Sequence, residues 1–146
     1  MPAFFLLILG LLASTLAQTP PQTPSLTIAQ SCTNITLTGN SFLSATCLTT
    51  TNLQAENELD LNLCVGIDYG TLGLTWSVYG KYTVYCGGCA LEAKGNPTSH
   101  WLTCSCRSIG NPNQAAVTSS LKLDDGMSNR NGTLTCNSWV VQEPGV

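Results

Sequence analysis

The most reactive side chains of this sequence are eight cysteines, four of which lie within the stretch from Tyr85 to Cys106. The stretch contains a Cys-x-x-Cys pair, Cys86 and Cys89, and a Cys-x-Cys pair that begins at Cys104. Four thiolates with this spacing could hold a structural zinc ion. A Cys-x-x-Cys pair at a helix N-terminus could exchange disulfides, and in an oxidising compartment the four residues would form two structural disulfides.

The N-terminal residues favour an oxidising compartment. An apolar run over residues 4–12 is followed by small residues, so we expect residues 1–17 to be a signal peptide and the mature protein to be secreted and extracellular. A transmembrane helix is the alternative, but the run is too short to cross about 30 Å of hydrocarbon, and we expect no membrane span. Residues 18–25 are a Pro-rich spacer, and we expect residues 140–146 to form a flexible tail.

The remainder of the sequence contains one unit twice, over about residues 26–81 and 82–139. The copies share a Cys-x-x-apolar-x-Leu segment, a Leu-x-small-x-Cys segment, a Leu-x-Leu segment and a Gly-Thr-Leu segment. These segments begin at Cys32, Leu43, Leu59 and Gly70 in the first copy, and at Cys86, Leu102, Leu121 and Gly132 in the second. Internal repeats of this kind usually define the architecture of the whole chain.

The repeat indicates how the cysteines pair. An apolar pair of the first copy, Ile35 and Ala45, is replaced in the second copy by Cys89 and Cys104. Core side chains facing each other across two strands explain both pairs, because the Cβ atoms of a disulfide lie about 3.8 Å apart. Zinc and redox chemistry remain as alternatives, disfavoured because an Ile/Ala pair cannot replace metal ligands and because the motif lies on a predicted strand. We expect the disulfides Cys32–Cys47, Cys86–Cys106, Cys89–Cys104 and, from the two cysteines left over, Cys64–Cys136.

Alternating apolar residues predict the strands that position these cysteines. The alternation over residues 35–45, with a turn at Gly39-Asn40, predicts that each unit begins with a β-hairpin. The step from Cys86 to Cys89 is odd, whereas the step between the two cysteines of the facing strand is even. Because side chains alternate between the faces of a strand, we expect a β-bulge near Gly87-Gly88.

Charge and residue types exclude several functions. The 146-residue chain has a net charge of −3 and only 9% charged residues, which does not suit a nucleic-acid binder, since that needs a basic face. The single histidine, His100, lies in a stretch that we expect to be an exposed loop, and Asp124 and Asp125 would point to opposite faces of a strand. No nucleophile–base set is evident, so we expect neither an enzyme nor a requirement for a cofactor.

The doubled order of these motifs resembles the cyanovirin-N homology family of small sugar-binding lectins. The resemblance rests on Cys32-Thr33-Asn34-Ile35, on residues 43–47, on Leu59-Asp60-Leu61-Asn62 and on residues 129–134, and it covers about residues 26–136. It implies an all-β fold with two pseudo-symmetric lobes, each a three-stranded antiparallel sheet plus a β-hairpin exchanged from the other repeat. It also implies no catalysis and no metal, binding of high-mannose glycans with terminal α1→2-linked mannose, and a monomer or a domain-swapped dimer.

The resemblance also implies one sugar site in each lobe. Amide and hydroxyl side chains both donate and accept hydrogen bonds, as sugar hydroxyls do. In the repeat-1 lobe the implied site residues are Thr27, Gln30, Ser31, Thr49, Thr50, Asn129 and Asn131, with Leu48 where the family often has a polar residue. In the repeat-2 lobe they are Lys81, Val84, Tyr85, Arg107 and Ser108, with Ile67 and Tyr69 from the first repeat's hairpin. Ile67 and Tyr69 cannot make the hydrogen bonds expected there, so we expect a weak, lost or altered site in this lobe.

Two alternatives bear on the sugar sites. Asn34-Ile35-Thr36 and Asn131-Gly132-Thr133 are N-glycosylation sequences, and a glycan on Asn131 would cover the repeat-1 site. Asn, Ser and Thr near turns also often serve the turn alone. The chain could then be a secreted disulfide-rich protein that keeps the fold without binding sugar. Such a protein would act through protein–protein contacts, for which Trp76, Trp101 and Trp139 are candidate anchors.

Overall fold

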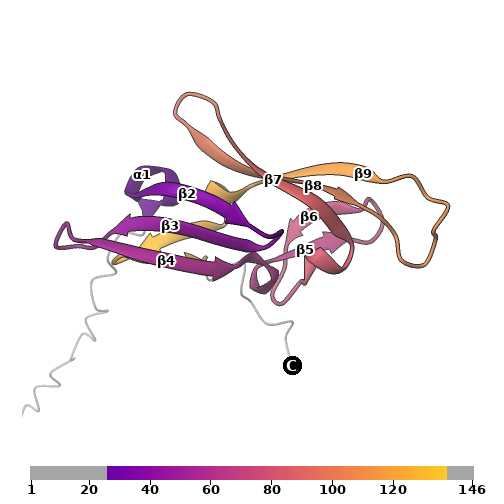
Figure 1. The fold of residues 1–146 in the computed structure, drawn as a ribbon, viewed down its shortest axis with the longest axis horizontal. Coiled ribbons are helices and arrows are strands. Elements are labelled where there is room, and N and C mark those ends of the chain that lie inside the picture. The colour runs from indigo at the N-terminus through magenta and orange to yellow at the C-terminus, as the bar shows by residue number, and fades with distance from the viewer. Residues whose placement is uncertain (1–25, 138–146) are drawn as a thin grey trace, which may run out of the picture.

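The computed structural model describes residues 26–137, which form small antiparallel sheets joined by short turns (Figure 1). The expected signal peptide, spacer and tail, and Trp139, lie outside the described residues. The first repeat contains β1 (Leu26–Thr27), α1 (Ile28–Ser31), β2 (Cys32–Thr38), β3 (Phe42–Leu48), β4 (Gln54–Asp60), the 3₁₀ turn η1 (Leu61–Leu63), β5 (Val65–Asp68) and β6 (Gly73–Trp76). The second contains the 3₁₀ turn η2 (Tyr82–Val84), β7 (Cys86–Lys94), β8 (Ser99–Cys106), β9 (Val117–Lys122), the 3₁₀ turn η3 (Leu123–Asp125), β10 (Met127–Arg130) and β11 (Thr133–Cys136).

The two repeats exchange their hairpins. Each repeat forms a three-stranded sheet, β2-β3-β4 or β7-β8-β9, but the hairpin that follows packs on the sheet of the other repeat. The backbone N–H of Leu74 in β6 donates to Ser119 Oγ in β9 at 2.7 Å. In the other lobe, the N–H of Leu134 in β11 donates to Asn57 Oδ1 in β4 at 3.2 Å. These contacts confirm the predicted all-β fold with two lobes and exchanged hairpins.

A short strand that the sequence pattern did not indicate extends the C-terminal hairpin. β1 pairs antiparallel with β10, Leu26 opposite Asn129 and Thr27 opposite Ser128, so this sheet has the strand order β1-β10-β11. Two residues are too short for an alternation pattern to be recognised. The strand places the start of α1 beside the hairpin that carries the repeat-1 candidate residues.

A β-bulge interrupts the first hairpin of both repeats. The register shifts between Gly87 and Ala90, which confirms the predicted bulge, and also between Thr33 and Thr36 in the first repeat. Gly88 and Asn34 occupy the same place in the two bulges, with φ of +58° and +52°. This left-handed conformation costs glycine nothing, and asparagine adopts it more readily than other side-chain-bearing residues do. The alternation in the first repeat therefore contained the same irregularity, which the apolar pattern alone did not reveal.

Four disulfides stabilise the molecule. The structure joins Cys32 to Cys47, Cys86 to Cys106 and Cys89 to Cys104, the pairs expected from the repeat, and Cys64 to Cys136, the pair expected from the two remaining cysteines. Three of them cross the first hairpin of a repeat, whereas the fourth links the residue between η1 and β5 of the first repeat to β11 of the second. A single apolar core surrounds them and runs through both lobes. Its fully buried side chains include Ile28, Leu43, Leu61, Tyr82, Leu102, Leu123 and Met127.

Two matching polar residues attach each repeat to the start of the other. Asn62 Oδ1 in η1 accepts hydrogen bonds from the Thr83 backbone N–H at 3.2 Å and from Thr83 Oγ1 at 2.9 Å. Asp124 Oδ1 in η3, at the corresponding place of the second repeat, accepts from the Ala29 N–H at 2.9 Å. The resulting contacts fix α1 and η2, the segments that carry part of each candidate site.

One part of the sequence alignment between the repeats was wrong. The β5–β6 register places Ile67 opposite Leu74, as the β10–β11 register places Asn129 opposite Leu134. Leu74, rather than Leu72, is therefore the counterpart of Leu134, and the Gly70-Thr71-Leu72 match was out of register by two residues. The reason is turn length, because residues 69–72 separate β5 from β6, whereas only residues 131–132 separate β10 from β11.

The prediction that His100 is an exposed loop residue was also wrong. His100 lies in β8 with only 13% of its side chain exposed, and its Nδ1 lies 3.6 Å from Asp124 Oδ2. Its backbone N–H donates to the same oxygen at 2.6 Å. Asp124 and Asp125 lie on a 3₁₀ turn rather than on a strand. Asp124 is buried, whereas Asp125 is exposed and its Oδ1 lies 3.1 Å from Lys122 Nζ.

No helix within residues 26–137 has the length and apolar character needed to cross a membrane.

Candidate functional site

The repeat-1 candidate residues come from three segments that meet at the left end of the molecule in Figure 1. The segments are the start of α1, the loop between β3 and β4, and the turn between β10 and β11. They carry Thr27, Gln30 and Ser31; Thr49 and Thr50; and Asn129 and Asn131, respectively. Residues from opposite ends of the sequence thus meet here because the hairpins are exchanged.

A pair of hydrogen bonds joins the β3–β4 loop to the C-terminal hairpin. Thr50 donates from both its backbone N–H and its Oγ1 to Asn131 Oδ1, each at 2.9 Å. Both residues are exposed, and Asn131 has a φ of +50°. The Nδ2 of Asn131 makes no hydrogen bond within residues 26–137, so two donors stay available beside the acceptor lone pairs of Thr50 Oγ1. This is a preformed pair of donor and acceptor groups at the surface.

Asn129 has a structural part in this arrangement. It is 5% exposed; its Nδ2 donates to the Leu48 carbonyl at 2.7 Å and its Oδ1 accepts from the Gly132 N–H at 2.8 Å. Ser31 is also buried, and its hydroxyl donates to the Thr27 carbonyl at 2.9 Å. The polar atoms of these two side chains are thus engaged within the protein, so both residues position the surface rather than present groups to a ligand.

Gln30 and Thr49 complete the surface. Gln30 is exposed; its Oε1 accepts from the Thr27 N–H at 3.2 Å, which leaves its Nε2 without a partner among the described residues. Thr49 Oγ1 accepts from the Leu53 N–H at 3.0 Å and lies 3.0 Å from Thr51 Oγ1, so Thr49 holds the β3–β4 loop in shape. The groups open to a ligand therefore belong to Gln30, Thr50 and Asn131.

Asn57 supports the repeat-1 candidate site, and sequence reasoning missed it. Its Nδ2 donates to the Gly132 carbonyl and its Oδ1 accepts from the Leu134 N–H, so one side chain fixes the hairpin that carries Asn131. A Cβ on Gly132 would lie 2.8 Å from Thr49 Cγ2, which shows how closely the turn approaches the loop. The available signal was a polar residue between Ala55 and Leu59, on the face of β4 that points inward.

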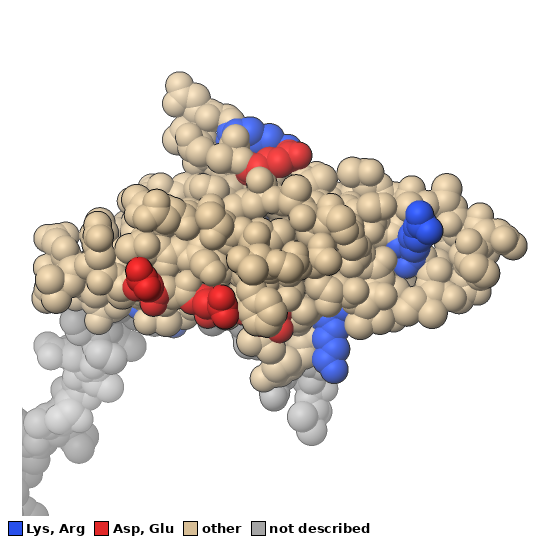
Figure 2. All heavy atoms as spheres, in the orientation of Figure 1, with Lys and Arg blue, Asp and Glu red and all other residues tan. Residues whose placement is uncertain are grey.

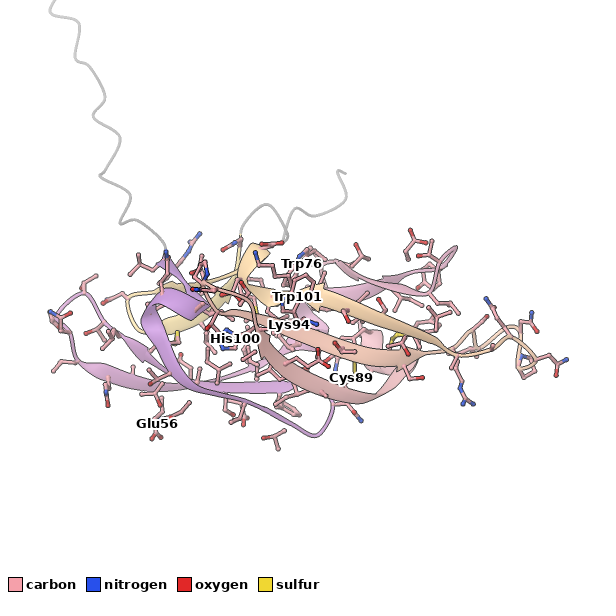
Figure 3. The ribbon with its side chains drawn as sticks, turned by 90° about the horizontal axis from the view of Figure 1, so that it is seen from above. Glu56, Trp76, Cys89, Lys94, His100 and Trp101 are labelled. Carbon is pink, nitrogen blue, oxygen red and sulfur yellow. A yellow bond between two sulfur atoms is a disulfide. The ribbon has the colours of Figure 1, made fainter. Side chains whose placement is uncertain are left out.

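The two glycosylation sequences lie in different surroundings. Asn34 is exposed in the β2 bulge and lines a shallow depression of about 480 Å³ on the sheet β2-β3-β4, together with Ser44, Ala45, Thr46, Glu56, Asn57 and Glu58. Glu56, one of these lining residues, is labelled in Figure 3. Asn131, in contrast, already accepts two hydrogen bonds from Thr50 in its turn.

The repeat-2 candidate residues also meet in space, but they form an aromatic surface. The rings of Tyr69 and Tyr85 pack edge to face, with centroids 5.5 Å apart and an interplanar angle of 84°. Tyr69 is 73% exposed, and Val84, which directly precedes Tyr85 at the end of η2, is also exposed. The Arg107 N–H donates to the Tyr85 carbonyl at 2.8 Å, which places Arg107 next to this pair. The neighbouring Tyr69 side chain raises the pKa of Tyr85 above its usual value.

The repeat-2 hairpin is stabilised differently from its repeat-1 counterpart. Ile67, at the place of Asn129, is a buried apolar residue. Asp68 organises the turn instead, since its Oδ1 accepts from the N–H groups of Gly70 at 2.8 Å and Thr71 at 3.0 Å. These backbone hydrogen bonds, first that of Thr71, lower the pKa of Asp68. Of the other candidate residues of this lobe, Lys81 lies at the start of η2 and Ser108 lies in the loop after β8.

Within residues 26–137, no group of three or more His, Cys, Asp or Glu side chains is arranged to hold a metal ion.

Comparisons with known proteins identify the fold. The CVNH domain family model matches residues 29–135. Among solved structures, the NMR structure of the CVNH protein of Gibberella zeae is 22% identical, has a TM-score of 0.64, and covers 73% of this chain and 94% of its own.

Two similar structures contain bound sugars. The microvirin:mannobiose complex is 23% identical with a TM-score of 0.62, and covers 77% of this chain and 99% of that one. A MoCVNH3 variant in complex with (N-GlcNAc)4 is 17% identical with a TM-score of 0.62, and covers 75% of this chain and 95% of that one. No curated protein sequence matched this chain.

Proposed function

This chain belongs to the CVNH domain family, and on that basis we propose that it is a lectin that binds mannose-rich glycans mainly through the repeat-1 lobe. The observation that carries the proposal is the Thr50–Asn131 bridge, which holds an open amide donor and a hydroxyl acceptor side by side at the surface. The similar structure of microvirin in complex with mannobiose supports a sugar of this class. We propose terminal α1→2-linked mannose as the preferred ligand.

The chemistry of the repeat-1 surface suits a neutral sugar. Its open groups are the Asn131 Nδ2, the Thr50 Oγ1 and the Gln30 Nε2, which carry no charge. Neighbouring sugar hydroxyls can each donate one hydrogen bond and accept others, so an amide and a hydroxyl in fixed positions can bind two of them. Because Asn129 and Asn57 fix the hairpin beforehand, little conformational entropy is lost when the sugar binds.

The test is a calorimetric titration of the oxidised protein with α1→2-mannobiose. Asn131→Ala removes both open donors, and we expect an affinity at least about tenfold lower, equivalent to about 1.4 kcal/mol. The matched control is Asn113→Ala, the same change in the exposed loop between β8 and β9, which should leave the affinity within about twofold. Equal affinities of Asn131→Ala and the wild type would contradict the proposed site. No binding of any mannose oligomer would favour the alternative of a protein that keeps the fold without the sugar function.

We further propose that the protein acts outside the cell after removal of its signal peptide, as a monomer or a domain-swapped dimer. If Asn131 carries a glycan, that glycan covers the site, whereas a glycan on Asn34 leaves it open. Peptide mass spectrometry of protein from a eukaryotic secretion host, with Asn131→Gln as the matched variant, tests this point. A glycan found on Asn131 of sugar-binding protein would contradict the proposal that this residue contacts the ligand.

A further inference from the structure

The repeat-2 end of the molecule carries groups that a neutral, hydroxyl-rich sugar does not require. From its exposed aromatic pair and its unpaired cations, we propose that this end binds an acidic oligosaccharide built from hexuronate units. In this arrangement a sugar ring stacks on the exposed ring of Tyr69, which Tyr85 supports edge to face, and the carboxylate of the sugar binds Arg107, with Lys81 adding positive charge. The inference rests on the proposed lectin function, but it assigns a different ligand to the opposite lobe.

The aromatic pair occupies the place that the sugar site has in the other lobe. By the repeat, Tyr69 corresponds to Asn131 and Tyr85 to Ser31. Ser31 is buried and engaged, whereas Tyr85 is partly exposed and packs edge to face against the 73% exposed Tyr69. An aromatic face binds the apolar face of a sugar ring, while the phenol hydroxyl stays free for a hydrogen bond. The pseudo-symmetric surface thus offers stacking in place of the amide and hydroxyl groups.

The distribution of cations favours a negatively charged ligand. Of the five Lys and Arg residues, all within residues 26–137, Lys94 lies 2.8 Å from Glu92 and Lys122 lies 3.1 Å from Asp125. The other three have no carboxylate partner among the described residues. One of them, Arg107, is hydrogen-bonded to the Tyr85 carbonyl, and another, Lys81, lies at the start of η2, four residues before Tyr85. Figure 2 shows how sparse charged groups are over the visible face. The planar guanidinium of Arg107 can bind a carboxylate with two parallel hydrogen bonds.

One acidic residue of this end, Asp68, would oppose an anion, but its carboxylate is occupied. Its Oδ1 accepts two backbone N–H groups within its own turn. In the register of β5, Asp68 also alternates with Ile67, and strand alternation directs their side chains to opposite faces of the hairpin. The negative charge of Asp68 therefore weakens the positive potential at this end, but its carboxylate does not compete directly with a ligand carboxylate for Arg107.

The loop beside the aromatic pair has room for an oligosaccharide. Residues 107–116 join β8 to β9, whereas residues 49–53 make the corresponding connection in the first repeat. The longer loop is exposed and extends at the right end of Figure 1. It presents the amide side chains of Asn111 and Gln114, which can bind the hydroxyls of further sugar units.

The experiment compares an oligogalacturonate with its fully methyl-esterified form, which has the same rings without the charge. In NMR titrations of the oxidised protein, we expect the acidic oligomer to bind at least about tenfold more tightly than the ester, and its binding to weaken with added salt. Arg107→Gln and Tyr69→Ser should each lower the affinity about tenfold. The matched control is Arg130→Gln, which removes the unpaired cation of the other lobe and should change the affinity less than about twofold.

Three results would overturn the inference: equal binding of acid and ester, equal losses for Arg107→Gln and Arg130→Gln, or no binding of either oligomer. If Tyr69→Ser instead abolishes self-association in size-exclusion chromatography without altering sugar binding, the surface is a protein interface and the inference is also wrong. Mannobiose binding by the same Arg107→Gln protein separates this inference from the proposed function, because mannobiose should still bind at the repeat-1 lobe. If the wild-type protein does not bind mannobiose, the proposed function is contradicted, and the oligogalacturonate result alone decides the inference.

Discussion

The strongest structural prediction concerns Asn129, whose buried side chain holds the C-terminal hairpin against the β3–β4 loop. Asn129→Ala removes the hydrogen bond to the Leu48 carbonyl and the one from the Gly132 N–H, which are 2.7 and 2.8 Å long. No other acceptor can replace the lost partner of the Gly132 N–H, because Gly132 is itself buried. The substitution therefore tests whether one side chain connects the two segments of the repeat-1 site.

The cost follows from the surroundings of the two backbone groups. The Gly132 N–H is left buried without a partner, which costs about 1–3 kcal/mol. Leu48 is 42% exposed, so water can reach its carbonyl, and the loss there is about 0.5–1.5 kcal/mol. Added together, the two losses lower the free energy of unfolding by about 1.5–4.5 kcal/mol, which lowers the Tm by roughly 6–18 °C for a domain of this size.

The assay is urea unfolding of the oxidised protein, followed by tryptophan fluorescence, with Asn113→Ala as the exposed matched control. The control should change the free energy of unfolding by less than about 0.5 kcal/mol. The slope of the free energy with urea should be unchanged in both variants, since the same surface is exposed. A loss below about 0.5 kcal/mol for Asn129→Ala would refute the reasoning, because it would mean that neither bond contributes to stability.

Three further predictions follow from the core. Gly126→Ala places a Cβ 2.2 Å from Trp76 Cε2, so we expect the free energy of unfolding measured in urea to fall by about 1–3 kcal/mol. An unchanged near-UV circular dichroism spectrum would contradict the clash. Replacing Cys64 and Cys136 by Ala opens a link with a sequence separation of 72 and should lower the free energy of unfolding by about 4 kcal/mol. Cys89→Ala with Cys104→Ala should lower it by only about 2 kcal/mol, because Cys86–Cys106 still closes that loop. The reverse order of the two losses in thermal unfolding would refute the loop-entropy argument. Burial, and then the Asp60 charge, raise the pKa of Tyr82, so its contribution to stability is complete below its unfolded pKa and is lost as the pH rises above about 10. Tyr82→Phe, which also removes the hydrogen bond to the Asn40 carbonyl, should flatten this alkaline decline of the free energy of unfolding. An undiminished decline in the variant would contradict the argument.

The sequence predicts the framework well because the framework is repeated. Two copies of each cysteine and leucine motif provide an internal comparison, and the Ile35/Ala45 pair opposite Cys89 and Cys104 identifies facing positions. The bulge at Gly88 follows from the parity of the cysteine spacing. The family identified from these motifs is confirmed by the CVNH domain match over residues 29–135.

The details that the sequence did not predict depend on contacts between distant segments. Whether Asn129 faces a ligand or the Leu48 carbonyl is decided by the packing of the hairpin on the other repeat, 81 residues away. The same applies to His100, whose backbone N–H donates to Asp124, 24 residues away, and whose side chain is only 13% exposed. The register error at Gly70 arose from a turn whose length differs between the repeats, and a short apolar match cannot detect such a difference.

The different chemistry of the two ends is compatible with one stable scaffold because the groups that hold the scaffold lie elsewhere. The disulfides, Asn62 and Asp124 fix the sheets, the 3₁₀ turns and the starts of both repeats without involving the exposed turns. Each hairpin also has its own internal support, Asn129 in one and Asp68 in the other. An exposed residue such as Tyr69 can therefore differ from its counterpart Asn131 at little cost in stability. A lectin built in this way can keep one sugar site while the opposite lobe changes its ligand.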